Sequence, residues 1–351
     1  MLMSTVCRYD DFLTDWYTEW ASRLHLSPEG KNAPSGHIVH RKAWEWCVIA
    51  QALMERGMLE PGRTGCGFAV GTEPLASAFA ARGVQVLATD QAGGENAENW
   101  IKSGQHAASL ESLYRPDLIS RSDFDSRVRF SPVDMRKLEL PWEEQFDFIW
   151  SSCSIEHLGT LEAGWRFVLD SMDLVKVGGF AIHTTEYNVT SNCATIETGD
   201  DVIYRERDVE ELDRRLRSIA CGLARCDFYA GDHPNDLDYD HWVFFKNRRP
   251  HVKLLIHGHV ATSMVLIIQK GSRPGVEVES LLAETHSVPP ADAANGRFDS
   301  VEQHIAQLRS EVAEQSARSA RIQARIEEIE KSFAWRVATF LRLAGRGDGG
   351  T

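Results

Sequence analysis

Acids and histidines in this sequence follow short apolar runs of the kind that form buried strands. Asp90 ends the run VQVLATD, and Asp134 lies in the run VRFSPVDM. An acid at the end of a strand can accept hydrogen bonds from both hydroxyls of a ribose, and we expect this of Asp90; a plain turn residue is the alternative. We expect Asp134 to accept a hydrogen bond from the exocyclic amine of a base. The two acids therefore predict a ligand that contains a nucleoside.

A glycine turn precedes the first of these acids. In the stretch GFAVGTEP, Gly71 lies where a strand passes into a helix, and a residue without Cβ lets backbone N–H groups approach a ligand. The G-x-G-x-x-G spacing of dinucleotide-binding proteins is missing from this turn. Glu73 in the same turn disfavours a diphosphate but suits a cationic ligand such as a sulfonium. These residues argue against NAD.

Three further residues are candidates for accepting a proton from a hydroxyl substrate. His157 follows the run FDFIWSS, while His183 and Glu186 lie in the run AIHTTEYN. Parallel sheets place substrates at the carboxyl ends of their strands, where these side chains are predicted to lie. We expect His157 to be the general base and Glu186 to be the next candidate. A helix-capping or packing histidine is the alternative for His157.

The elements that must position these residues alternate between strands and helices. Over residues 61–273, apolar runs such as VQVLATD and SMVLIIQK are separated by helical stretches. This alternation predicts an α/β domain with a mostly parallel sheet that helices cover on both faces.

Residues 1–60 are predicted to form a helical cap. The stretches YDDFLTDWYTEWASRL and HRKAWEWCVIAQALMERGML both place apolar side chains at helical spacing. In the second stretch, His40, Arg41 and Trp44 are candidates for closing over a sugar, with an aromatic face and a charged hydrogen-bonding group. An amphipathic helix that buries Trp44 is the alternative.

The last part of the chain is predicted to be a linker and a coiled coil. Residues 274–299 are rich in Pro, Gly and Ala and lack periodicity, which indicates a flexible tether. In residues 300–345 apolar side chains recur in steps of four and three, as in a coiled-coil seam. We expect self-association through this helix; packing of the seam on the preceding domain is the alternative. Its basic, aromatic end KSFAWRVATFLRLAGR is expected to contact anionic lipid or a membrane-bound partner.

Composition and charge narrow the classes of partner. A formal net charge of −13 disfavours nucleic acid, whose binding relies on clustered Lys and Arg. No apolar stretch reaches membrane-spanning length and no basic leader opens the sequence, so a cytoplasmic protein is expected, with a peripheral place at the inner membrane face. The segment GDHPNDLDYDH has metal-ligating residue types but fits no metal spacing, and a solvated acidic loop is expected there. The sequence therefore assigns no metal site.

Over residues 61–273 the order of these motifs resembles that of class I S-adenosylmethionine-dependent methyltransferases. The resemblance implies a Rossmann-like sheet whose last strand, MVLIIQK, is antiparallel. It implies that the glycine turn contacts the methionine moiety and that the fourth-strand tip faces both cofactor and acceptor. The cofactor-binding residues expected on this basis are Gly71, Thr72, Glu73, Asp90, Asp134, Met135, Ser151 and Ser152. The acceptor-binding residues expected are His40, Arg41, Trp44, Glu156, Tyr187 and Asn188.

A closer resemblance points to one group within that family. The stretches GFAVGTEPLASAFAARG, HTTEYN and VIYRERDVEEL, and the ending SFAWRVATFLR, are similar to methyltransferases associated with bacterial glycosyltransferases and surface-polysaccharide assembly. This resemblance implies a hydroxyl of a sugar or polysaccharide-related molecule as the acceptor and a glycosyltransferase as a partner. A nicotinamide-dependent oxidoreductase and a non-catalytic scaffold of a glycan-assembly complex are the alternatives.

Overall fold

The structure is a computed structural model. It describes residues 1–26, 38–91, 107, 109–138, 143–241 and 250–272 of the 351-residue chain. The predicted linker (274–299) and the predicted coiled-coil helix (300–345) lie outside these residues. Self-association and membrane or partner contact through the tail therefore stay predictions.

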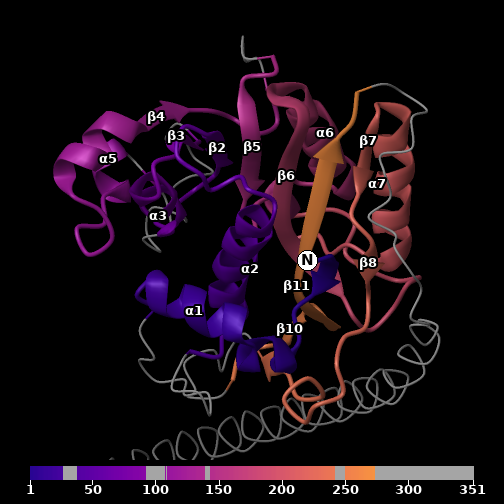
Figure 1. Cartoon of the computed structure of the whole chain (residues 1–351). Helices are drawn as coiled ribbons and strands as arrows, with labels where there is room; N and C mark the ends of the chain where they lie inside the picture. The colour runs from indigo at the N-terminus through magenta and orange to yellow at the C-terminus, as the bar shows by residue number, and fades with distance from the viewer. Residues whose placement is uncertain (27–37, 92–106, 108, 139–142, 242–249, 273–351) are drawn as a thin grey trace, which may run out of the picture. The chain divides into compact units, whose positions relative to one another are not determined.

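One mixed sheet organises the described residues (Figure 1). Its strands lie in the order β4-β3-β2-β5-β6-β11-β1-β8. The first five are parallel to one another, and β11 is antiparallel to β6. These six strands are β2 (Thr64–Phe68), β3 (Gln85–Asp90), β4 (Val128–Pro132), β5 (Phe146–Ser151), β6 (Val175–Asn188) and β11 (His259–Lys270). The parallel order and the antiparallel last strand confirm the sheet predicted from the sequence.

The beginning of the chain adds a strand that the sequence does not predict. β1 (Ser4–Val6) lies between β11, to which it is antiparallel, and β8 (Cys226–Asp227), to which it is parallel. The prediction of helices throughout residues 1–60 misses it, because three residues are too few to show a periodicity. Part of the predicted cap thus belongs to the sheet itself.

Helices and short strands complete the domain. The α-helices are α1 (Asp15–Arg23), α2 (Arg41–Glu55), α3 (Leu75–Ala81), α5 (Arg121–Arg127), α6 (Leu161–Ser171) and α7 (Glu206–Ser218). The 3₁₀ helices are η1 (Tyr9–Leu13), η3 (Leu110–Leu113), η4 (Ile155–His157) and η5 (Met172–Leu174). The short strands are β7 (Cys221–Leu223), β9 (Asp240–His241) and β10 (Leu254–Ile256). Of these elements, α2 packs on β6 and β11, which brings the predicted cap onto the sheet.

Helices α3 and α6 cover opposite faces of the sheet. Phe79 of α3 packs edge-on against Phe148 and Trp150 of β5. Phe167 of α6 packs edge-on against Phe68 of β2. The connection from β2 through α3 to β3 and the connection from β5 through α6 to β6 run in opposite directions along the sheet. Because both crossovers are right-handed, their helices lie on opposite faces. Helices therefore cover both faces, as predicted.

The early glycines of the stretch GCGFAVG have a packing role. Gly65 and Gly67 lie in β2, and a Cβ on either would overlap the ring of Phe148 or of Trp150 on the neighbouring strand. Large aromatic rings on β5 thus require small residues on β2. This explains why glycines stand inside the strand rather than across the turn that follows it.

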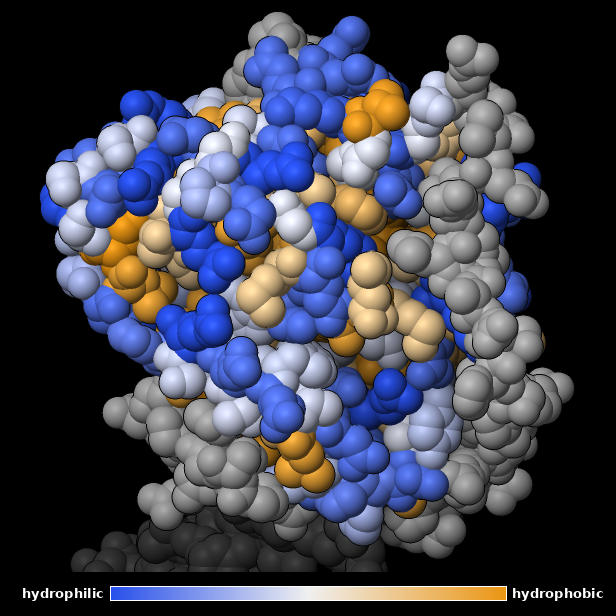
Figure 2. Space-filling view, in the orientation of Figure 1, coloured by the Kyte–Doolittle hydropathy of each residue, from blue (hydrophilic) through white to orange (hydrophobic). Residues whose placement is uncertain are grey.

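The face seen in Figure 2 is mostly hydrophilic. Apolar residues on its described part form separate small groups rather than one continuous patch, as the figure shows. Among the described residues, no helix has the length and apolar character needed to cross a membrane. Most large apolar side chains are instead buried between the sheet and its helices.

Candidate functional site

The glycine turn after β2 and the acid at the end of β3 lie together, as predicted. Gly71 has a backbone φ of +51°, in the left-handed region that favours glycine. Its N–H donates to Oδ2 of Asp90 at 3.2 Å, and the N–H of Ala107 donates to the same oxygen at 2.9 Å. The N–H of Gln91 donates to Oδ1 at 2.8 Å. These bonds orient a buried carboxylate and use three of its roughly four acceptor positions.

Glu73 faces the interior rather than a ligand at the turn. Its side chain is buried, and its Oε1 accepts a hydrogen bond from Nε1 of Trp150 at 2.6 Å. Burial raises the pKa of this carboxyl to about 8, and the bond from Trp150 opposes only part of that shift. The group is therefore largely protonated at neutral pH. The argument that an anion at this turn repels a diphosphate is wrong, because the carboxyl is neither exposed nor ionised there.

Asp134 follows β4 on the same edge of the sheet as Asp90. The N–H of Val133 donates to the carbonyl of Asp90 at 2.8 Å, which ties the two strand ends together. Nε and Nη2 of Arg136 donate to the carboxylate of Asp134, both at 3.0 Å, and this contact lowers its pKa. Met135 is buried beside it. The adenine contact of Asp134 stays a prediction, and so does the cofactor contact of Thr72, which is exposed at the turn.

Buried polar side chains link helix α2 to the carboxyl ends of β5 and β6. Nη1 of Arg41 contacts Oε1 of Glu186 and donates to Oγ of Ser263 at 3.1 Å. Glu45, one turn further along α2, accepts from Oγ of Ser263 at 2.5 Å and from Oγ of Ser152 at 3.1 Å. Burial alone would lower the pKa of Arg41, but its acidic neighbours, with Glu186 first, raise it. Arg41 therefore holds Glu186 in place and is not open to a substrate.

Glu45 and His251 are functional-site residues that the sequence analysis does not single out. Nε of Arg41 donates to Nε2 of His251 at 3.3 Å, and Nδ1 of His251 lies 2.7 Å from Oδ2 of Asp240. Because arginine has no acceptor, the ring proton of His251 must be on Nδ1, where it is donated to Asp240. The spacing of Arg41 and Glu45 at i and i+4 is the one sequence signal for this network, since it places both side chains on one helix face.

Three buried side chains with metal-ligating atoms meet after β5 and on β6. One ligand atom from each of Cys153, Glu156 and Glu186 lies within 4.8 Å of the others. Sγ of Cys153 donates to Oε1 of Glu186 at 3.5 Å, and Oγ1 of Thr185 donates to Oε2 of Glu156 at 3.0 Å. Burial raises the pKa of Glu156. Burial also acts to raise the pKa of Glu186, but the charges of Arg41 and Lys42 and the hydrogen bonds from Arg41 and Cys153 together outweigh it, and the pKa is lowered.

The two candidate histidines have different surroundings. His157, in η4, keeps 23% of its side chain exposed, and its Nδ1 lies 2.8 Å from the carbonyl of Asp200 and 3.1 Å from Oδ1 of Asp201. Burial acts to lower its pKa, but Asp201, Glu156 and the carbonyl of Asp200 together outweigh this, and the pKa is raised. His183 is completely buried, its Nδ1 lies 2.8 Å from Oγ of Ser151, and burial lowers its pKa to about 3. His183 is thus a neutral core side chain, and the structure does not favour it as a base.

Several predicted acceptor-binding residues have structural roles instead. Trp44 is completely buried, and its Nε1 donates to Oδ2 of Asp11 at 2.9 Å, so it cannot close over a sugar. Nδ1 of His40 accepts from the N–H of Lys42 and caps α2. Tyr187 is buried and stacks on Phe228. For Trp44 the alternative of an amphipathic helix with a buried face is confirmed.

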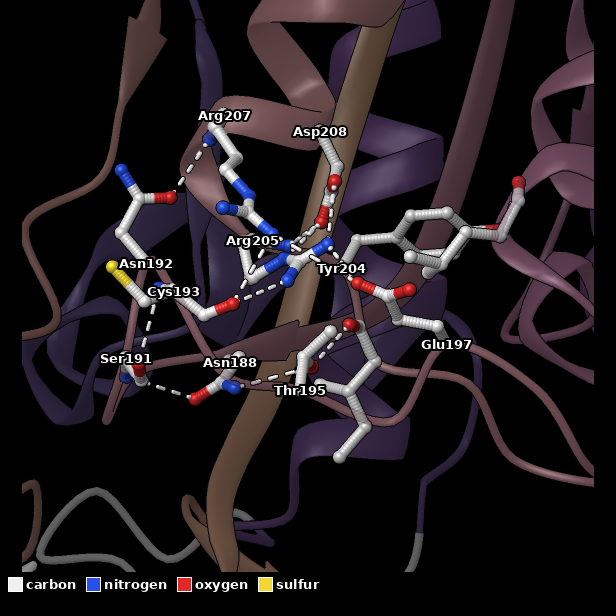
Figure 3. Close-up of polar contacts among 12 residues, drawn as sticks. Asn188, Ser191, Asn192, Cys193, Thr195, Glu197, Tyr204, Arg205, Arg207 and Asp208 are labelled. Atoms are coloured by element: carbon white, nitrogen blue, oxygen red, sulfur yellow. Dashed lines mark hydrogen bonds and ion pairs between the residues drawn. The ribbon is translucent and has the colours of Figure 1, made fainter.

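The segment after β6 is tied down by Arg205, a side chain that is 97% buried, with 3% exposed (Figure 3). Its Nη1 donates to the carbonyl of Cys193 at 2.5 Å, and its Nη2 donates to Oε1 of Glu197 at 2.9 Å. Nε donates to Oδ2 of Asp208 at 2.7 Å. Asn188 bonds the same segment through its amide and its carbonyl oxygen, so this predicted acceptor-binding residue organises the loop.

Two acids of the segment GDHPNDLDYDH are buried, whereas Asp232 and Asp238 are exposed as expected of a solvated loop. Asp236 is buried, and its Oδ1 accepts from Nζ of the buried Lys253 at 3.0 Å and from the N–H of Tyr9 at 2.9 Å. Asp240 is paired with His251. The expectation of a solvated loop is wrong for these two acids, because Asp236 pairs with a buried lysine and bonds the beginning of the chain, and Asp240 pairs with a buried histidine.

Known proteins with similar structures are distant in sequence. No family model matches this chain, and no curated protein is significantly similar to it. It is 13% identical to phosphoethanolamine N-methyltransferase 2 from Haemonchus contortus, with a TM-score of 0.41, and the match covers 75% of this chain and 60% of that enzyme. This chain thus spans less than two thirds of the length of the Haemonchus enzyme.

Two bacterial proteins are similar over almost their whole length. An S-adenosylmethionine-dependent methyltransferase from Mesorhizobium loti is 11% identical, with a TM-score of 0.39 and coverage of 63% of this chain and 96% of that one. An S-adenosylmethionine-dependent methyltransferase from Clostridium acetobutylicum is 12% identical, with a TM-score of 0.37 and coverage of 65% and 92%. Similarities at this level assign neither an activity nor a substrate.

Proposed function

We propose that this protein transfers a methyl group from S-adenosylmethionine to a hydroxyl of a small acceptor. The observation that carries the proposal is the pairing of Gly71 with Asp90 at the carboxyl edge of a sheet that also has an antiparallel last strand. Ligands of such sheets bind at the carboxyl ends of the strands, beside the place where the strand order reverses. In this chain that place lies between β2 and β5.

The residues at this edge fit the nucleoside part of the cofactor. Asp90 is buried and oriented by backbone N–H groups, and at least one acceptor position of its carboxylate is left for a ribose hydroxyl. Asp134 lies at the adjacent strand end, where it is proposed to accept from the adenine amine. When bound, S-adenosylmethionine supplies a methyl group that is already activated by its sulfonium. The protein must therefore mainly align the acceptor and exclude water.

His157 is proposed to take the proton of the acceptor hydroxyl. It is the one predicted base that stays partly exposed, and Asp201 fixes its Nδ1 as the donor nitrogen. The lone pair is then on Nε2, which lies 3.9 Å from Oε1 of Glu156. The carboxylate of Asp201, on the Nδ1 side, orients the imidazole and stabilises the ring once it is charged. Glu186 is tied to Arg41 and is less able to serve.

A sugar or polysaccharide-related acceptor is proposed from the resemblance described above. Two carboxylates, Glu156 and Glu186, lie near the proposed base, and carboxylates suit donors such as hydroxyl groups. The tail (300–345) is proposed to associate with itself and to bind a glycosyltransferase or a membrane surface. Sedimentation of a variant without residues 300–351 tests this; an unchanged oligomer would contradict it.

Isothermal titration with S-adenosylhomocysteine and with NAD tests the proposed function. We expect saturable binding of S-adenosylhomocysteine and no binding of NAD.

A variant of the strand-end acid tests the nucleoside contact. Asp90→Asn should weaken binding of S-adenosylhomocysteine by about 1 to 3 kcal/mol, because ribose hydroxyls lose an acceptor. Asp170→Asn, at an exposed position of α6, is the matched control and should bind like the wild type. Binding of NAD alone, or equal affinity in Asp90→Asn, would contradict the proposal.

A further inference from the structure

Cys153, Glu156 and Glu186 form a buried cluster beside the proposed base. All three are buried, and one ligand atom from each lies within 4.8 Å of the others. Cys153 and Glu156 follow β5, and Glu186 lies on β6. Backbone φ of Cys153 is +47°, an unusual value that directs its side chain toward the carboxylates. The adjacent ends of two parallel strands thus bring together a thiol and two carboxylates.

Each of the two carboxylates has one buried oxygen without a hydrogen-bond partner among the described residues. Oε1 of Glu156 and Oε2 of Glu186 are buried and have no hydrogen-bond partner among the described residues. Glu156 is 0% exposed and Glu186 is 5% exposed. Leaving a buried charged oxygen unsatisfied is costly, and such oxygens in native proteins are typically occupied by an ion, a water or a ligand. This observation is independent of the cluster's composition and indicates that something binds there.

The other oxygen of each carboxylate is fixed by a neighbour. Oγ1 of Thr185 donates to Oε2 of Glu156, and Arg41 contacts Oε1 of Glu186. Arg41 is in turn held by His251. Metal-ligating carboxylates are generally oriented by hydrogen bonds of this kind. The cluster therefore has the supporting contacts of a metal centre as well as the ligand atoms.

The buried charges around the cluster do not balance. Two cations, Arg41 and Lys42, face three carboxylates, those of Glu45, Glu156 and Glu186. Nε2 of His157 also lies 3.9 Å from Oε1 of Glu156, but the nearer carboxylate of Asp201, 3.1 Å from Nδ1, offsets the charge of this ring. A divalent cation bound to Cys153 as the thiolate brings the group to neutrality. With the thiolate present, a monovalent cation or a neutral ligand would leave the group with a net negative charge.

We propose that Cys153, Glu156 and Glu186 bind one divalent transition-metal ion, with zinc as the expected metal. A thiolate with two carboxylates suits zinc better than magnesium or calcium, which prefer oxygen ligands only. A tetrahedral centre with bonds of about 2.3 Å to sulfur and about 2.0 Å to oxygen separates the two ligands by about 3.5 Å. The ligand atoms of the three residues lie within 4.8 Å of one another, a spread that a single small ion can draw together.

Three protein ligands leave one coordination position open, as in catalytic zinc sites. That position lies at the edge of the sheet where substrates bind. An oxygen of water or of an acceptor hydroxyl bound there becomes more acidic. The role toward an acceptor rests on the proposed function, whereas metal binding itself does not.

The test is metal binding by the untagged full-length protein. After exchange into metal-free buffer, zinc is titrated in competition with a chromophoric chelator, and bound metal is counted by mass spectrometry. We expect one zinc per chain. Cobalt in place of zinc should give the thiolate-to-metal charge-transfer absorption. Because neither readout involves the cofactor or methyl transfer, failure here is distinguishable from failure of the proposed function.

Variants locate the site. Glu156→Gln and Cys153→Ser should each weaken zinc binding at least about 10- to 100-fold, and Cys153→Ser should abolish the charge-transfer absorption. Cys226→Ser and Glu60→Gln, which lie elsewhere in the chain, are the controls and should bind like the wild type. Zinc should also raise the melting temperature of the wild type. It should leave that of Glu156→Gln unchanged, and a normal melting transition of this variant would show that it is folded but no longer binds zinc. Equal zinc affinity in Glu156→Gln and the controls, or no stoichiometric zinc, would overturn the proposal. Binding of magnesium alone, unchanged in Cys153→Ser, would overturn it as well.

Discussion

The two halves of the sheet's carboxyl edge are built differently. At the ends of β2, β3 and β4, Asp90 accepts hydrogen bonds from three backbone N–H groups of its own neighbourhood. At the ends of β5 and β6, Glu186 depends on Arg41 from α2, 145 residues away, and keeps an unpartnered buried oxygen. The first half is thus built from contacts between residues close in the sequence. The second half is built from contacts between residues far apart in the sequence, and some of its buried oxygens have no hydrogen-bond partner among the described residues. Sequence patterns suffice for the first kind of site and not for the second.

The largest expected effect concerns His157, in the second half. If this half carries the chemistry, His157→Ala should lower the rate of methyl transfer by about 10²- to 10⁴-fold, because the acceptor loses its base. Affinity for S-adenosylhomocysteine should stay nearly unchanged. The rate is measured with excess cofactor, and His25→Ala, at an exposed histidine, is the control. A full rate in His157→Ala would move the role of base to another residue and weaken the division between the halves.

Arg41 tests whether the second half depends on buried charge pairing. Arg41→Ala should destabilise the fold by about 3 to 5 kcal/mol, because Glu186 and Glu45 lose their buried partner. The free energy of unfolding is measured by denaturant titration. Arg166→Ala, which removes an exposed pair, should cost little.

A double variant sharpens this result. Arg41→Met with Glu186→Gln should recover part of the loss, since the uncompensated charge is removed together with its partner. If the single Arg41→Ala variant were as stable as Arg166→Ala, the network would not be a source of stability.

The smallest effect concerns Glu73, in the first half. Its pKa in the fold is about 8, above the ordinary 4.5, so the folded state holds a proton that the unfolded chain releases more easily. Stability should therefore fall as pH rises from about 5 to 8, by about 3 kcal/mol from this group. Glu73→Gln should flatten that fall while keeping an acceptor for Trp150. Melting temperatures at pH 5 and pH 8 check this, with Glu60→Gln as the control; parallel curves for Glu73→Gln and the wild type would contradict it.

The sequence predicts the central strands, their parallel order and the meeting of Gly71 with Asp90, because each follows from local patterns and from the geometry of parallel sheets. It does not predict where Glu73 points, since that depends on Trp150 on another strand. For the same reason Trp44 and Asn188 read as binding residues although they are structural. Burial is decided by distant partners, and a single sequence does not show which partners meet.

The place of β1 bears on how the protein is made. Among the described strands it leaves the ribosome first, yet its partner β11 leaves last: the N–H of Ile267 donates to Oγ of Ser4 across 263 residues of chain. Contacts of such sequence separation slow folding, because a long loop must close before they form. A nascent chain of this protein therefore carries β1 without its β11 partner until residues 259–270 have been made, which is a window for chaperones and for misassembly. The pairing of β1 with β11 can form only after β11 has been made, and loss of either strand should impair the same cooperative unit.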